Sequence, residues 1–205
     1  TMVEDARNEA LKRIKDEVLT LEESPLYEYR TKNHYFPVIG EGDHYAKLMF
    51  VGEAPGRTEA QTGRPFVGAA GRILEELLES VGMNRSEVYI ANILKDRPPE
   101  NRDPLPEEIN VYGPFLDRQI EIIQPSVIAT LGRYSLGYIM RKFELELYLQ
   151  PISYMHGKSF AAKASYGDIS IVCLYHPAVA VYNNKMKDTL KKDFQIVKTL
   201  ISHHE

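Results

Sequence analysis

Apolar runs that alternate with helical patterns are the feature that most constrains how this chain can fold. Four runs are continuously apolar, which is typical of strands buried on both faces: KLMFV at 47–51, VYIANIL at 88–94, SVIATLG at 126–132 and DISIVCLYH at 168–176. Helices are expected beside them, at about 3–21, 69–81, 106–123, 135–143 and 185–202. The pattern predicts an α/β fold, a three-layer α/β/α sandwich with a four-stranded parallel sheet.

The length of 205 residues and the hydrophobic content of 43% suit one domain, 1–205, which begins with the helix at about 3–21. The formal net charge of −4 argues against binding of nucleic acid by bulk charge, although it allows a local basic groove. No apolar run approaches the roughly 18 to 20 residues of a membrane span, and the N-terminal stretch is too charged for a signal peptide. We therefore expect a cytoplasmic, intracellular protein with no membrane partner.

Three turn-like segments follow the ends of these strands. They are GEAPG at 52–56, NILKDRPPENR at 92–102 and YHPAVA at 175–180. Ligands of an open parallel sheet bind beyond the carboxyl ends of its strands. We therefore expect the three segments to meet in one site, although they are far apart in the sequence.

The GEAPG segment has two interpretations. It is a tight strand-to-helix turn in which Gly52 and Gly56 relieve backbone strain and Pro55 fixes φ, or its backbone N–H groups cradle a phosphate or a polarised carbonyl. It matches neither a Walker A loop nor the dinucleotide-binding motif. The carboxylates of Glu53 and Glu59 suit a site beside a developing cation, whereas solvated surface positions are the competing interpretation.

Three further side chains suggest recognition of a base. Asn92 lies at the end of an apolar strand, and its amide matches the edge of a base, although a buried Asn bonded to loop backbone is an equal alternative. Phe66 could stack on a base or belong to the core. His176, held by the following proline, could act in catalysis or only pack and cap.

Basic residues of the proline-stiffened loop suggest contact with a nucleic-acid backbone. Lys95, Arg97 and Arg102 all occur in KDRPPENR. Such residues contact phosphates in many complexes, whereas simple solvated charge is the alternative interpretation.

Together these motifs resemble one known family. GEAPGRTEAQTGRPFVGAAG, VYIANILKDRPPENRDPLPEEI, VIATLGRYSLGYIM and LYHPAVAV follow the order and wording of the family 4 uracil-DNA glycosylases of bacteria and archaea. The resemblance implies a prokaryotic, monofunctional DNA repair enzyme that hydrolyses the N-glycosidic bond of uracil in single- or double-stranded DNA. It also implies a sheet between helices, and we expect a monomer. Gly52 and Gly56 would then provide clearance for the base and sugar.

The resemblance also implies roles for individual residues. Phe66 would stack on a flipped uracil, and Asn92 would bond to its Watson–Crick edge. Glu59 would lie beside uracil C5, where it would exclude the methyl group of thymine. His176 would face uracil O2, and Glu53 would lie near the glycosidic bond with a catalytic water. These residue types fit a reaction whose transition state carries a cationic sugar and an anionic base.

The chain departs from the family at its metal ligands. Cysteines of the family motif, which ligate a structural 4Fe–4S cluster, are replaced here by Leu21, Ser24, Asp96 and Tyr112. Cys173 is the only cysteine, so the sequence predicts no cysteine-ligated cluster and no metal site. We expect local packing of tyrosines to replace the cluster, and the candidates are Tyr27, Tyr29, Tyr35 and Tyr112.

A second departure concerns the wedge that fills the DNA stack after base flipping. Ala180 stands at about the position where the superfamily often has a leucine-like wedge, with Val179, Val181 and Tyr182 nearby. These departures leave an alternative open, a DNA-binding protein of the same fold that recognises uracil or another damaged base with weak or no turnover. The retained pocket residues argue against it, and the lack of a P-loop argues against a generic nucleotide-binding domain.

Overall fold

A six-stranded sheet forms the centre of the computed structural model, which describes residues 5–205. The strands lie in the order β1-β3-β2-β4-β6-β5. Their bounds are Glu41–Gly42 (β1), Leu48–Gly52 (β2), Tyr89–Asn92 (β3), Val127–Leu131 (β4), Ser159–Ala164 (β5) and Gly167–Leu174 (β6). The four inner strands, β3, β2, β4 and β6, pair in parallel, as predicted. The α/β fold class is confirmed.

Two antiparallel edge strands make the sheet larger than the four strands predicted. β1 pairs with β3, and β5 forms a hairpin with β6 that turns at Ser165 and Tyr166. β1 is only two residues long, and β5 alternates between exposed and half-buried positions. Continuous apolar runs mark only strands that are buried on both faces. The two edge strands have one face in solvent, so they lack such runs and were not predicted.

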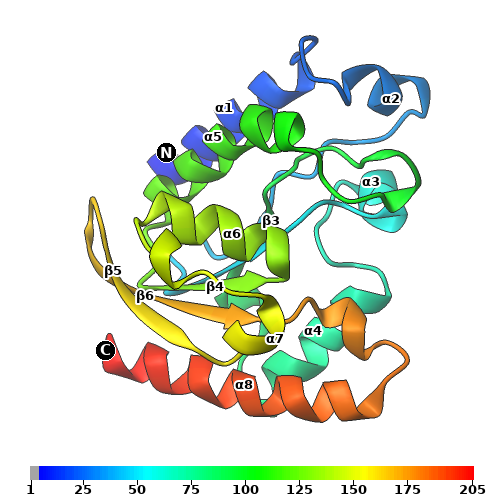
Figure 1. Ribbon diagram of the computed structural model, residues 1–205. Helices are drawn as coiled ribbons and strands as arrows, with labels where there is room; N and C mark the ends of the chain where they lie inside the picture. The colour runs from blue at the N-terminus through cyan, green and yellow to red at the C-terminus, as the bar shows by residue number, and fades with distance from the viewer. Residues whose placement is uncertain (1–4) are drawn as a thin grey trace.

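Helices cover both faces of the sheet. Their bounds are Ala6–Leu19 (α1), Tyr27–Lys32 (α2), Arg57–Thr62 (α3), Ala69–Ser80 (α4), Pro106–Ile123 (α5), Arg133–Lys142 (α6), Ile152–Met155 (α7) and Asn184–His203 (α8). Helices α1, α5 and α6 lie above the sheet in Figure 1, and α4 and α8 lie below it. The layers are therefore those of an α/β/α sandwich.

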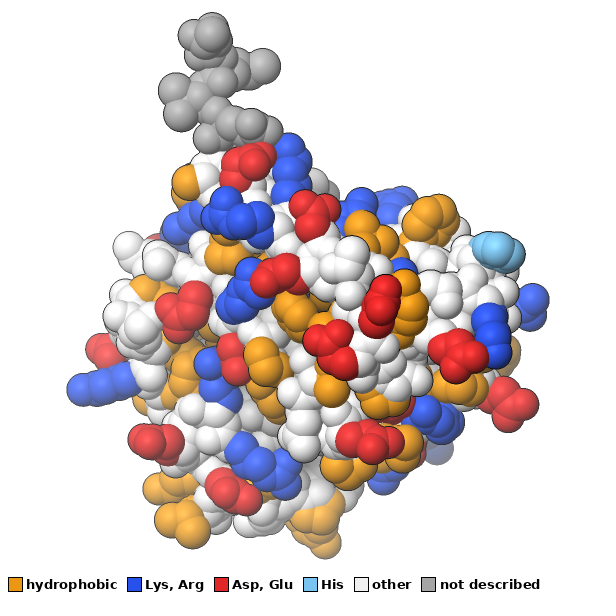
Figure 2. Space-filling view, turned by 90° about the horizontal axis from the view of Figure 1, so that it is seen from above, with side chains coloured by type: hydrophobic (Ala, Val, Ile, Leu, Met, Phe, Trp, Pro, Cys, Tyr) orange, Lys and Arg blue, Asp and Glu red, His pale blue; other side chains and the backbone are white. Residues whose placement is uncertain are grey.

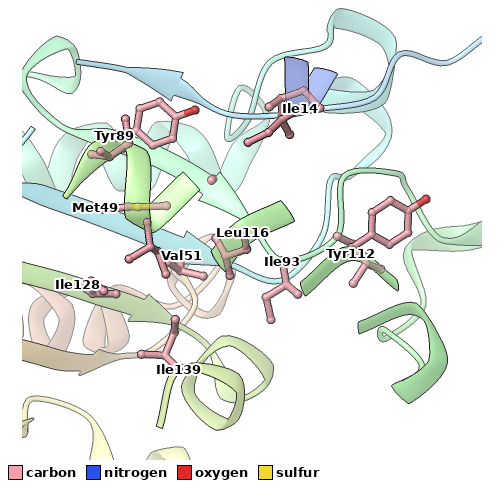
Figure 3. Close-up of a cluster of buried hydrophobic side chains, with 14 of the residues drawn as sticks. Ile14, Met49, Val51, Tyr89, Ile93, Tyr112, Leu116, Ile128 and Ile139 are labelled. Atoms are coloured by element: carbon pink, nitrogen blue, oxygen red, sulfur yellow. The ribbon is translucent and has the colours of Figure 1, made fainter. Parts of the chain in front are cut away.

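Side chains of β2 show how the two cores are built. Met49 and Val51 point to the core under α1, α5 and α6 (Figure 3), while Leu48 and Phe50 point to the core over α4 and α8. The Phe50 ring stacks on that of Phe194 from α8, with centroids 5.8 Å apart. Each such buried side chain contributes about 1.5 to 3 kcal/mol, so burial on both faces fixes the strand at the centre of the sheet.

The N-terminal helix is shorter than the predicted 3–21. Asp5 caps it by accepting a hydrogen bond from the backbone N–H of Arg7, and it ends at Leu19. Residues 3 and 4 lie outside the described part of the chain. The helix packs on α5 through a buried stripe that includes Ile14 and Val18.

Candidate active site

A cavity of about 410 Å³ opens at the carboxyl ends of the parallel strands, where the three turn-like segments meet. These segments follow β2, β3 and β6 and lie on the right of Figure 1. The lining includes most of the residues that the sequence singled out: Glu53, Gly56, Glu59, Phe66, Asn92, Arg102 and His176. The predicted convergence of distant segments is therefore what the fold produces.

The end of β2 is a glycine because the neighbouring side chains leave no room for a methyl group. Gly52 pairs with Asn92 of β3. A Cβ atom at Gly52 would lie 2.3 Å from Asn92 Oδ1 and 2.8 Å from the ring of Phe66. The close approach of these three residues, rather than a special φ, requires the glycine.

Asn92 presents an unsatisfied acceptor at this end of the sheet. Its side chain is 2% exposed, and Oδ1 has no hydrogen-bond partner among residues 5–205. An unpaired buried acceptor costs about 1 to 3 kcal/mol, which a ligand N–H group would recover. The amide also carries donors, so it can bond to a planar group that offers a donor and an acceptor side by side.

Phe66 has its backbone in the left-handed region, with φ of 48°. Arg85 holds this conformation, because its Nη1 donates to the Phe66 carbonyl at 2.5 Å and its Nη2 donates to the Pro65 carbonyl. A Cβ at Gly71 would lie only 1.9 Å from the Phe66 oxygen. The Phe66 ring faces His176, with centroids 5.6 Å apart and 29° between the planes. The strained backbone therefore aims an aromatic surface into the cavity.

Glu59 joins the two loops on this side of the cavity. Its Oε1 accepts from the N–H of Gly56 at 3.1 Å, and its Oε2 accepts from the N–H groups of Val67 at 3.2 Å and Gly68 at 2.9 Å. A carboxylate bound by backbone N–H groups is fixed in place. Glu59 thus both lines the cavity and holds the segment that follows Phe66.

Glu53 approaches the N-terminus of α6. Its Oε1 lies 3.4 Å from the N–H of Tyr134, and a Cβ at Gly132 would come within 2.3 Å of the same oxygen. Gly132 has φ of 94°, which favours glycine there as well. Burial raises the pKa of the Glu53 carboxyl, while the helix N-terminus opposes this shift. The group is a half-buried base that can accept a proton.

His176 has a defined tautomer. Its Nδ1 accepts a hydrogen bond of 3.1 Å from the N–H of Ala178, so the proton of the neutral ring lies on Nε2. Burial lowers the pKa of His176 to about 4. The ring is therefore neutral at physiological pH and can donate one hydrogen bond through Nε2.

Comparison with known proteins identifies the family. The model of the Uracil DNA glycosylase superfamily matches residues 39–198. A type-4 uracil-DNA glycosylase of Sulfurisphaera tokodaii is 42% identical over 94% of this chain and 85% of its own length. The chain belongs to the type-4 branch of this superfamily. Type-4 uracil-DNA glycosylases of Archaeoglobus fulgidus (42% identical, 91% of each chain) and Thermotoga maritima (36% identical, 95% of this chain and 96% of the relative) are similar over comparable lengths.

In this member of the glycosylase superfamily, Lys95 cannot contact DNA, contrary to the prediction. Its side chain is fully buried, and Nζ donates to the carbonyls of Asn92 at 2.6 Å and Ile39 at 3.3 Å and to Gln119 Oε1. Burial lowers the pKa of Lys95 to about 7. The side chain of Lys95 thus points into the core after β3, where its ammonium group holds the backbone carbonyl of Asn92.

The two predicted DNA-binding arginines of the same loop are bonded within the protein. Arg97 donates to two tyrosine hydroxyls, and Arg102 forms two hydrogen bonds of 2.8 Å with the carboxylate of buried Glu108. Arg102 still lines the cavity. On the top face of the molecule, Lys and Arg are interspersed with Asp and Glu (Figure 2), so the described residues in that view gather no single sign of charge.

The expected DNA contact of Ala180, at the usual wedge position of the superfamily, is also wrong. Ala180 is 1% exposed and packs in the core between the sheet and helices α4 and α8, because a 3-10 turn at Pro177–Ala180 directs it inward. Val179 is 40% exposed and Tyr182 is 99% exposed. Tyr182 is thus the large exposed side chain just after this turn.

Arg85 holds the backbone that aims Phe66, but no sequence motif singles it out. An arginine in the polar turn MNRSE suggests solvated charge, and its two carbonyl partners face it only because of the left-handed residue at 66. A non-glycine residue with positive φ leaves no sequence pattern. The role of Arg85 therefore becomes visible only in three dimensions.

Proposed function

We propose that this protein excises uracil from DNA by hydrolysing its N-glycosidic bond and leaving an abasic site. One observation carries the assignment of the site: Asn92 Oδ1 is a buried acceptor beside the cavity, with no hydrogen-bond partner in the described part of the chain. Uracil offers the N3–H donor next to a carbonyl oxygen, which matches the amide of Asn92. Because the chain belongs to this family, we assign the reaction to base excision repair.

The target nucleotide would leave the DNA stack before reaction. Extrusion costs a few kcal/mol, which stacking of uracil on Phe66 and hydrogen bonding to Asn92 would offset. Glu59 holds the backbone after Phe66, and the resulting rigid wall beside uracil C5 would exclude the methyl group of thymine. Recognition would therefore combine an aromatic surface, an amide and a steric limit.

Bond cleavage would separate charge between the sugar and the base. As the C1′–N1 bond breaks, its electron pair goes to the uracil, and Nε2–H of His176 would donate to O2, where negative charge accumulates. Glu53 would stabilise the cationic sugar and accept a proton from the water whose oxygen bonds to C1′. Removal of one transition-state donor, here Nε2–H of His176, typically lowers the rate about 10² to 10³-fold. Both His176 and Glu53 would act on charge that develops only in the transition state.

Several further features belong to the proposal. We propose that the protein acts as a monomer inside a prokaryotic cell, that residues 1–205 form one glycosylase domain, and that both single- and double-stranded DNA serve as substrates. We also propose that it needs no metal or cofactor. None of the helices in residues 5–205 is long and apolar enough to cross a membrane.

An assay with labelled oligonucleotides tests the function. The protein is incubated with single- and double-stranded DNA that carries one uracil, and alkali then cleaves any abasic site. We expect strand cleavage at uracil but not at thymine, and its loss in Asn92→Asp, which replaces the amide donor by an acceptor. If micromolar wild-type protein binds uracil-containing DNA but gives no cleavage, the protein is a damaged-base binder instead.

A further inference from the structure

The positions of the family's cluster cysteines do not fit an iron–sulfur cluster here. They hold Leu21, Ser24, Asp96 and Tyr112, which offer no thiolate. The one cysteine, Cys173, is buried in β6, and burial raises the pKa of its thiol to about 12. Within residues 5–205, no group of His, Cys, Asp and Glu is arranged to hold a metal ion. These four positions therefore do not supply the ligands that a 4Fe–4S cluster requires.

A buried polar network occupies this place instead. Asp96 forms an ion pair with Arg30, with 2.9 Å between Oδ1 and Nε, and its Oδ2 accepts a hydrogen bond from the Tyr112 hydroxyl. Ser24 Oγ lies 2.6 Å from the Tyr112 oxygen and accepts from the N–H of Leu26 at 3.1 Å. All four residues, Ser24, Arg30, Asp96 and Tyr112, are buried, with at most 5% of their surface exposed. Three of the four cluster positions thus take part in one network.

The direction of the hydrogen bonds follows from the number of protons. The Tyr112 hydroxyl has one proton, which it uses to donate a hydrogen bond to Asp96. Ser24 is therefore the donor in its hydrogen bond with the Tyr112 oxygen. Tyr112 projects its hydroxyl away from the apolar cluster of Figure 3. Burial raises the pKa of Asp96, whereas Tyr112 and Arg30 lower it by stabilising the carboxylate. The chain of donors therefore ends on a carboxylate whose charge Arg30 balances.

The network joins the N-terminal segment to the loop after β3. Arg30 Nη2 also donates to the carbonyls of Val18 and Leu19 at the end of α1. One residue beyond Asp96, Arg97 donates to the hydroxyls of Tyr29 and Tyr35, both at 3.1 Å. These contacts attach the start of the loop to α1, α2 and the turn that follows.

This loop, residues 97–104, forms one wall of the uracil cavity. Residues 98 and 101–104 line the cavity. Glu100 and Asn101 both have left-handed backbones, with φ of 57° and 55°, which non-glycine residues adopt only when their surroundings hold them. Arg97 Nε holds Asn101 Oδ1 at 2.7 Å, and Arg102 pairs with Glu108 at the far end. The loop is thus strained and anchored at both ends.

We propose that the Arg30–Asp96–Tyr112–Ser24 network is a metal-free anchor that positions loop 97–104 as a DNA-facing wall of the uracil cavity. Asp96 is then a positioning residue that acts through Arg97 and the loop. The proposal rests on the proposed function for its substrate. It replaces the expectation that tyrosine packing alone compensates for the missing cluster, since a charged pair is at the centre of the network.

Two variants test the anchor without relying on a buried unpaired charge. Tyr112→Phe removes one hydroxyl, and Arg30→Met/Asp96→Leu replaces the ion pair by apolar side chains, a change that buried pairs often tolerate. We expect both proteins to fold, by circular dichroism, and their KM for uracil-containing DNA to rise about ten- to a hundredfold, as for loss of a hydrogen bond to a charged group. The single-turnover rate at saturation should stay within about threefold of wild type, because the reacting groups lie outside the loop.

A matched control and a second readout make the outcomes distinct. Lys32→Ala breaks the exposed Lys32–Glu28 pair on the same α2 and should leave KM unchanged. The Kd for abasic product DNA should rise in parallel with KM, and this readout needs no turnover. If wild type is inactive but the Kd still shifts, the function is wrong and the anchor stands.

Two results would overturn the anchor. One is an unchanged KM and Kd in both the Tyr112→Phe variant and the double variant. The other is stoichiometric iron in anaerobically purified protein, with an absorption band at about 400 nm as thiolate-bound iron gives. We expect neither, and we expect thermal unfolding of the wild type to be the same with and without a chelator.

Discussion

Gly52 and Asn92 lie opposite each other at the ends of two parallel strands, so close that a methyl group on Gly52 would overlap the Asn92 side chain. The distance from such a Cβ to Asn92 Oδ1 would be 2.3 Å. The glycine is therefore part of the proposed base-recognition site even though it contributes no functional group. Its effect is to let the amide and the Phe66 ring converge.

Gly52→Ala should accordingly impair uracil excision more than folding. The added methyl group must displace Asn92 or Phe66, and we expect a single-turnover rate at least about a hundredfold lower, comparable to loss of a transition-state donor, with a stability loss of about 1 to 3 kcal/mol from overpacking. Gly137→Ala is the control, because its Cβ would meet only the flexible end of Arg141. Equal activity of the two variants would contradict the close approach.

His176 should act as a neutral donor across the physiological pH range. Because burial lowers its pKa to about 4, the rate should not follow a titration near the usual histidine pKa of about 6.5. An acidic limb should come instead from Glu53, whose pKa is raised and which works as a carboxylate. His176→Ala should lower the single-turnover rate about 10² to 10³-fold with little change in DNA affinity, and a pH–rate profile of each protein checks both points.

The lowered pKa of His176 also makes the free energy of unfolding depend on pH. The unfolded chain binds a proton at His176 more readily than the folded protein, so folding should weaken as pH falls from about 6.5 towards 4. Urea unfolding at several pH values measures this dependence. In His176→Ala the dependence should be smaller over that interval, and an identical slope would show that the folded ring is easily protonated.

Arg85→Ala should weaken uracil binding through Phe66. Without the guanidinium, the two carbonyls at Pro65 and Phe66 lose their donors, and the left-handed backbone at Phe66, which costs about 1 to 3 kcal/mol, is free to relax. We expect the inhibition constant of free uracil to rise about tenfold or more, as for loss of about one hydrogen bond. Arg85 also forms an ion pair with Glu41. Arg64→Ala, which breaks the second, surface ion pair of Glu41, should not change the inhibition constant.

Tyr182→Ala tests which side chain fills the DNA stack. Tyr182 is 99% exposed after the His176 turn, whereas Ala180 is buried. Flipping from a duplex leaves a gap that an inserted side chain can fill, so the variant should lose more activity on double-stranded than on single-stranded DNA. Tyr154→Ala removes another exposed tyrosine and should affect both substrates equally. A uniform effect of both variants would exclude Tyr182 as the wedge.

The sequence predicted the inner sheet and most of the cavity because both follow from local patterns. Continuous apolar runs mark strands buried on both faces, and the carboxyl ends of parallel strands meet at one edge. Glu53, Phe66, Asn92 and His176 each lie within a few residues of such an end or on the connection that follows it. Their convergence at the cavity therefore required only the correct topology.

The errors arose where tertiary contacts override local composition. Lys95 belongs to a proline-rich polar loop, yet it is buried because Ile39 and Gln119, from distant segments, supply acceptors around its ammonium group. Ala180 follows two exposed residues but is turned inward by a 3-10 turn. The burial of Lys95 and Ala180 depends on residues distant in the chain, so local sequence patterns do not predict it.

The buried network also sets the order in which this protein can form during synthesis. Ser24 and Tyr112, which share a hydrogen bond, are 88 residues apart in the chain. Contacts over such distances require closure of a long loop. While the chain emerges from the ribosome, its N-terminal third therefore has no partner for this contact, and the proposed anchor of loop 97–104 can form only after Tyr112 has been made.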